Sequence, residues 1–167
     1  MRKSFVPVFA VLFAVMLAGV AMAADSSSDT QALVLKVNAI SELAITGSTV
    51  TMTVVGAPAG SGLTAVDDST TKYAVTTNGT GMKITGVLDS AMPTDTTLTI
   101  ALAAPTLEGC SSAGPVSLSD TAADLVTGIT TLSASDLGIT YELGALLTAG
   151  PVGTFDRTVT LTMVAGS

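Results

Sequence analysis

Few side chains in this chain could carry catalysis. It contains no histidine, one cysteine, Cys110, and only three glutamates, Glu42, Glu108 and Glu142. Without histidine, the Ser-His-Asp and Cys-His mechanisms and the commonest zinc sites are excluded. Two carboxylates suffice for glycoside hydrolysis, but Glu142 falls on the solvent face of a predicted strand and Glu42 lies between two extended pieces. We therefore expect no enzyme, no catalytic residue and no cofactor.

Aspartates near predicted turns could supply oxygen ligands to calcium. Calcium needs six to eight such ligands, and no run here has the spacing of a helix-loop-helix calcium site. We expect these carboxylates to be solvated and predict no metal site. The aspartates concerned are Asp67, Asp68, Asp89, Asp95, Asp120, Asp124 and Asp136.

The single cysteine cannot form a disulfide within the chain. Cys110 lies in the loop-like sequence Glu108-Gly109-Cys110-Ser111-Ser112. A spare thiol is the simpler interpretation, and a bridge between two molecules is the alternative.

The N-terminus has the pattern of an export signal. Arg2 and Lys3 precede the apolar run 5–20, and Ala21-Met22-Ala23 has the small-x-small form that signal peptidase cleaves. A retained membrane anchor is the alternative, but the run is short for a hydrocarbon core of about 30 Å. We predict cleavage after residue 23, no stable membrane anchor, and a protein that is extracellular, on the cell surface or periplasmic.

The charge of the mature chain limits its partners. Cleavage removes two basic residues and no acidic one, so the formal net charge changes from −7 to −9. Nucleic acid and anionic lipid are therefore poor candidate partners.

Alternating apolar and polar residues run through most of the mature chain. In residues 154–164, Phe155, Arg157, Val159, Leu161 and Met163 share one face, with a period of two that only a strand can use. The same pattern predicts strands over residues 32–40, 43–46, 49–55, 72–77, 82–88, 97–103, 116–118 and 138–146. Residues 119–126 are the only predicted helical turn, with Ser119 or Asp120 as its cap.

A tight hairpin is predicted where two of these strands meet. Asn78-Gly79 separates residues 72–77 from residues 82–88, and this dipeptide tolerates the positive φ angles of a two-residue hairpin turn. We expect the two strands to pair with each other.

The fold class predicted from these patterns is all-β. About seven to nine short strands separated by turns are typical of an antiparallel sandwich or barrel. The threonine-rich strands 49–55, 97–103 and 154–164, together with the Asn78-Gly79 turn, resemble the small immunoglobulin-like sandwiches of bacterial surface and fimbrial proteins. The chain departs from chaperone-usher pilins because it lacks a cysteine pair and a C-terminal aromatic residue. We expect a signal peptide at 1–23, a flexible segment at 24–31 and an immunoglobulin-like β-sandwich at 32–167.

The function that the resemblance implies is structural or adhesive, in a subunit of an extracellular filament or matrix. Leu33, Leu35, Val37 and Ala39 form an apolar row that could enter a neighbouring subunit by strand exchange, so the expected partners are further copies or other surface proteins. Pairing inside its own domain is the alternative for this strand. The alternative function is a soluble carbohydrate- or small-ligand-binding domain, which would need exposed aromatic residues such as Tyr73 or Tyr141.

Overall fold

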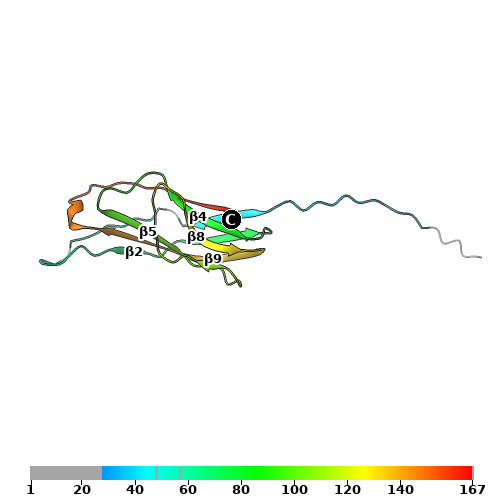
Figure 1. The fold of residues 1–167 in the computed structure, drawn as a ribbon, viewed down its shortest axis with the longest axis horizontal. Helices are drawn as coiled ribbons and strands as arrows, with labels where there is room; N and C mark the ends of the chain where they lie inside the picture. The colour runs from blue at the N-terminus through cyan, green and yellow to red at the C-terminus, as the bar shows by residue number, and fades with distance from the viewer. Residues whose placement is uncertain (1–27, 48, 57, 167) are drawn as a thin grey trace, which may run out of the picture. The chain divides into compact units, whose positions relative to one another are not determined.

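A computed structural model describes residues 28–47, 49–56 and 58–166. The predicted signal peptide, residues 1–23, lies outside the described residues. The chain divides into a segment that ends at Lys36 and a compact unit, Val37–Ser167 (Figure 1).

The N-terminal segment has no regular structure where it is described. Residues 28–36 form neither helix nor strand, and all of their side chains are exposed. The predicted strand 32–40 is therefore not formed, and the first strand begins at Ser41. A strand without a neighbour leaves its backbone groups unpaired and its apolar face uncovered, so alternation alone does not produce a strand here.

The described part of the compact unit contains two antiparallel sheets, which confirms the all-β prediction. In the six-stranded sheet the order is β1 (Ser41–Thr46), β3 (Lys72–Thr77), β9 (Leu132–Ala145), β5 (Thr96–Leu102) and β7 (Val116–Ser117), and β2 (Val66–Asp68) also pairs with β9. In the four-stranded sheet the order is β10 (Val159–Ala165), β4 (Met82–Leu88), β8 (Ala123–Ile129) and β6 (Ser111–Ser112). A 3-10 turn, η1 (Leu147–Ala149), follows β9.

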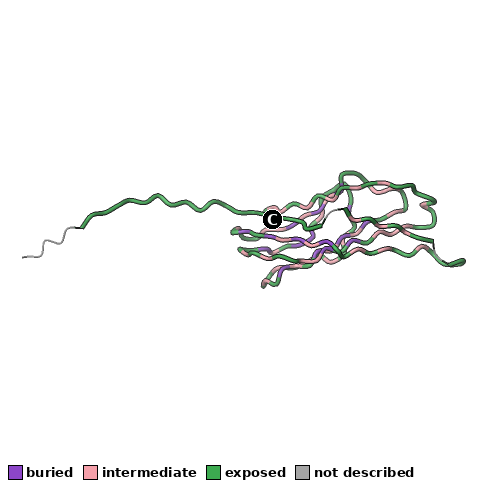
Figure 2. Tube along the Cα trace, turned by 180° about the vertical axis from the view of Figure 1, so that it is seen from behind, coloured by how far each residue is buried: buried purple, intermediate pink, exposed green. Residues whose placement is uncertain are grey.

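The core forms from the inward faces of both sheets. Buried positions alternate along β3, β4 and β5, as the period of two requires. Figure 2 shows the buried stretches, in purple, within the compact unit, whereas the described N-terminal segment is exposed throughout. The fully buried side chains come from both sheets, which gives the unit a sandwich-like architecture. They are Tyr73, Val75, Ile84, Ile100, Leu102, Leu125, Val126, Ile129 and Ile139.

The predicted hairpin at Asn78-Gly79 is wrong, although both strands have the predicted bounds. β3 pairs with β1 and β9, whereas β4 pairs with β10 and β8, so the connection crosses from one sheet to the other. The positive φ angle in this connection falls on Gly81 and not on Asn78 or Gly79. A connection between layers does not need the turn that aligns two paired strands.

The helical turn predicted at 119–126 is also wrong. Residues from Ala123 form β8, in which Leu125, Val126 and Ile129 are fully buried. Alanines at 122 and 123 favour helix locally, but pairing with β4 and β6 outweighs that preference.

The predicted strand 49–55 is extended but does not pair within the described residues. Its side chains alternate as predicted, since Val50, Met52 and Val54 are half-buried and the threonines between them are exposed. Val50 and Met52 pack against the core.

Candidate strand-addition surface

Asn78 holds the chain immediately before β1. Its side-chain Oδ1 accepts a hydrogen bond from the backbone N–H of Ile40 at 2.8 Å, and its Nδ2 donates to the carbonyl of Asn38 at 2.8 Å. The carbonyl of Ile40 also accepts from the Thr77 hydroxyl at 2.9 Å. These bonds fix residues 38–40 in line with β1, and we call them the Asn78 clamp.

The clamp sits at an end of the compact unit where several connections meet. The N–H of Thr131, between β8 and β9, donates to the carbonyl of Gly79 at 2.8 Å. The N–H of Gly166, just after β10, donates to the carbonyl of Gly81 at 2.7 Å. The start of β1 and the end of β10 therefore lie at the same end of the unit.

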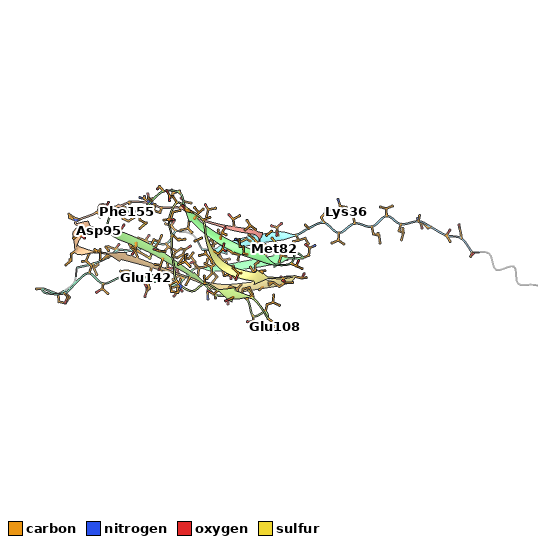
Figure 3. All side chains as sticks on the ribbon, in the orientation of Figure 1. Lys36, Met82, Asp95, Glu108, Glu142 and Phe155 are labelled. Atoms are coloured by element: carbon orange, nitrogen blue, oxygen red, sulfur yellow. The ribbon has the colours of Figure 1, made fainter. Side chains whose placement is uncertain are left out.

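The residues predicted for strand exchange belong to no strand of the described structure. Leu33, Leu35 and Val37 are 70%, 85% and 85% exposed, and Ala39 is exposed as well. Val34, on the other face of the predicted strand, is 98% exposed. Side chains of this segment, including the labelled Lys36, stand along an extended chain (Figure 3). We call residues 32–39 the arm.

Each sheet of the described part ends in strands with a free edge, and these differ in how well they are protected. β6 and β7 have two residues each, and β2 has three, two of which are Asp67 and Asp68. β1 has six residues and carries Glu42. β10 has seven residues, Val-Thr-Leu-Thr-Met-Val-Ala, with no charge and no proline.

The core is incompletely covered where β1 and β10 lie near each other. In β10, Val159, Leu161 and Met163 pair with the buried β4 residues Leu88, Gly86 and Ile84 and pack against the core, but they are only half-buried. In β1, Leu43 is half-buried and Ile45 is 45% exposed, although they pair with the buried residues Val75 and Tyr73. Inward-facing apolar side chains therefore remain accessible along this side.

The tyrosines of the alternative ligand-binding hypothesis are core residues. Tyr73 is fully buried and its hydroxyl donates to the carbonyl of Ala103, and Tyr141 is 9% exposed. Burial raises the pKa of Tyr73, and burial together with the nearby Asp68 carboxylate raises the pKa of Tyr141. Neither ring is available as a platform for a sugar.

The guanidinium of Arg157 lies over the ring of Phe155, with its Cζ atom 5.3 Å from the ring centroid.

Three of the aspartates considered as calcium ligands have partners within the protein. Asp124 forms an ion pair with Lys83 at 3.0 Å, Asp89 accepts a hydrogen bond from the N–H of Thr158, and Asp68 accepts from Thr70. Among the residues that the structure describes, no three His, Cys, Asp or Glu side chains are grouped closely enough to hold a metal ion.

The remaining features offer little chemistry. Cys110 is a half-buried free thiol, and burial raises its pKa. A shallow cavity of about 230 Å³ opens beside the Lys83–Asp124 pair and is lined partly by glycines, among them Gly81 and Gly128. No helix in the described ranges combines the length and apolar character needed to cross a bilayer.

Sequence patterns predicted the apolar row of the arm but not the clamp or the free edge. The partners of Asn78 lie 38 and 40 positions away along the chain, and no local pattern encodes such a contact. The free edge of β10 follows from the pairing of strands in the sheet, which alternation leaves undetermined.

The architecture defines an all-β, sandwich-like protein with an apolar arm before its first strand. Comparison of the chain with protein-family models, with curated proteins and with solved structures found no match.

Proposed function

We propose that this protein is an exported, non-enzymatic structural subunit with an immunoglobulin-like sandwich, and that it assembles with further copies through its arm. The observation that carries the proposal is the exposed row of Leu33, Leu35 and Val37 on a chain that forms no strand. The N-terminal export pattern supports a location outside the cytoplasm, at the cell surface, in the extracellular space or in the periplasm.

Exposed apolar rows are unfavourable in water and favourable in an intermolecular sheet. Burying a leucine side chain contributes roughly 1.5–3 kcal/mol, and adding a strand to a sheet edge also pairs its backbone groups. The arm has the length and alternation for such an addition and contains neither proline nor glycine. In a filament or matrix, the same strand addition would join each subunit to the next.

A matched pair of substitutions tests the proposal. The mature chain, residues 24–167, would be compared with Leu35→Asp and Val34→Asp by sedimentation and electron microscopy. We expect the mature chain to form large assemblies, Leu35→Asp to remain monomeric, and Val34→Asp to assemble, because only the Leu35 face should be buried in the assembly.

Two results would reject the proposal. A mature chain that stays monomeric at high concentration would show that it is not a self-assembling subunit. Assembly that is unaffected by Leu35→Asp would show that copies associate without the arm.

A further inference from the structure

We infer that the acceptor for the arm is the free edge of β10 on a second copy of the chain. This inference rests on the proposed function and specifies the partner surface. The arm would lie beside β10 as an additional strand of the four-stranded sheet, with Leu33, Leu35 and Val37 directed into the incompletely covered side of the core.

Backbone hydrogen bonds define which groups of β10 are available. Just before β10, the carbonyl of Thr158 accepts a hydrogen bond from the N–H of Asp89, the residue after β4. Just after β10, the N–H of Gly166 donates to the carbonyl of Gly81, the residue before β4. Because the direction of backbone bonds alternates along a strand, the even-numbered residues of β10 bond to β4. The N–H and C=O groups of Val159, Leu161 and Met163 therefore point to the free edge, where no strand of the described part pairs with them.

The side chains of the same three residues point into the core. In an antiparallel addition, a residue that exchanges both backbone bonds with Leu161 carries its side chain on the same face of the sheet as Leu161. Every second arm residue would thus form backbone hydrogen bonds with β10 and direct its side chain towards the core. Leu33, Leu35 and Val37 share one parity, so a register that places Leu35 opposite Leu161 would bring all three over Val159, Leu161 and Met163, which are half-buried.

The other edges are less suited to accept a strand. Natural sheets protect edge strands by shortness and by charge, and both devices occur here. β6 and β7 are two residues long, β2 carries two aspartates and β1 carries Glu42. β10 has seven residues and neither device.

The Asn78 clamp favours a second copy over the chain's own arm. β1 starts, and β10 ends, at the end of the unit where the clamp lies. To lie along its own β10, the arm would have to reverse its direction at residues 38–40, which the clamp holds in line with β1. An arm from another molecule needs no such reversal.

Amide hydrogen exchange resolved by residue tests this geometry. The acceptor would be the full mature chain carrying Leu33→Asp and Leu35→Asp, which change only exposed side chains and block self-assembly. The probe would be a synthetic peptide of residues 30–40, with the same peptide carrying Leu35→Asp as its control. Without peptide, we expect slow exchange at Thr160, Thr162 and Val164 and fast exchange at Val159, Leu161 and Met163.

Added wild-type peptide should slow exchange at Val159, Leu161 and Met163 by about tenfold or more, as newly paired strand amides require, and the control peptide should not. Protection that appears instead at Ser41, Leu43 and Ile45 would place the acceptor on β1 and overturn the inference while leaving the proposed function intact. Failure of the peptide to protect any edge amide would overturn it too. If the mature chain also stayed monomeric, the proposed function would fall with it.

Discussion

Gly86 sits where three leucine side chains converge on the inner face of β4. A Cβ atom at this position would lie 2.7 Å from Cδ1 of Leu125, 3.3 Å from Cδ2 of Leu118 and 3.4 Å from Cδ2 of Leu161. Two of these leucines are buried in the core, and Leu161 belongs to the proposed acceptor strand. The absence of a side chain at residue 86 therefore lets β8 and β10 supply the packing above β4.

This crowding leaves no room for a side chain at residue 86. Gly86→Ala should lower the free energy of unfolding by about 1–3 kcal/mol, the usual cost of overpacking a core. The control is Gly56→Ala, where a Cβ atom would meet nothing within 4 Å and where we expect a change within about 0.5 kcal/mol. Urea unfolding of both variants measures the difference, and equal stabilities would contradict it.

Tyr73 gives a prediction about alkaline pH. Its buried phenol has a raised pKa, whereas in the unfolded chain the pKa is about 10. Above pH about 10 the unfolded chain releases this proton and the folded chain retains it, so the unfolded state binds fewer protons and stability falls as pH rises. The stabilising contribution is fully present below pH about 10 and is lost above it.

Tyr73→Phe should therefore have two separable effects. At neutral pH it should cost about 0.5–1.5 kcal/mol, because the hydrogen bond to the Ala103 carbonyl is lost. Between pH about 9 and 11 its stability should decline less steeply than that of the wild type; a residual slope is expected because the pKa of Tyr141 is also raised. Urea unfolding across this range tests both effects, and parallel pH profiles would show that Tyr73 does not cause the decline.

Alternation along the strands predicted which side chains are buried better than it predicted which strands pair. The bounds of β3 and β4 follow directly from the sequence pattern, and the inward faces of β5 and β10 are as expected. The predicted pairing of β3 with β4 was wrong because a period of two indicates which side chains of a strand are buried. It does not indicate which other strand pairs with its backbone. β9 begins at Leu132, six residues before the predicted strand, because a register shift opposite Tyr73–Val75 and the positive φ of Asp136 interrupt its alternation.

The Asn78 clamp should order the chain before β1. Asn78→Ala removes the bonds to Asn38 and Ile40, so amide exchange at Ile40 should become faster and stability should fall by about 1 kcal/mol. Asn38→Ala is the matched control, since the clamp uses only the backbone carbonyl of Asn38. Hydrogen exchange and urea unfolding provide the measurements. Unchanged exchange at Ile40 in Asn78→Ala would mean that the clamp does not order the chain before β1.

For the whole molecule, the proposed interface has two halves, and the sequence patterns predicted only the donor half. The sequence supplied the donor row, because Leu33, Leu35 and Val37 lie close together in a periodic segment. The proposed acceptor was inferred from strand order in two sheets and from the partial exposure of inward-facing residues of β1 and β10, which are separated by more than a hundred positions in the chain. Such information arises only when the fold is assembled, so local pattern could not provide it.

The proposed assembly should respond to salt according to the charge of the whole molecule. Copies cleaved after residue 23 would carry a formal charge of −9 and would repel one another, whereas β10 carries no charge and Lys36 is the one charge of the arm. The repulsion between charges reaches about 30 Å at 0.01 M ionic strength and about 8 Å at 0.15 M. Added sodium chloride therefore weakens the repulsion between copies and leaves the apolar contact in place. The concentration needed for assembly, measured by sedimentation, should therefore fall as salt rises over this range, while Leu35→Asp stays monomeric throughout. Assembly that is instead weakened by salt would show that ion pairs between copies, and not the burial of the arm, hold the subunits together.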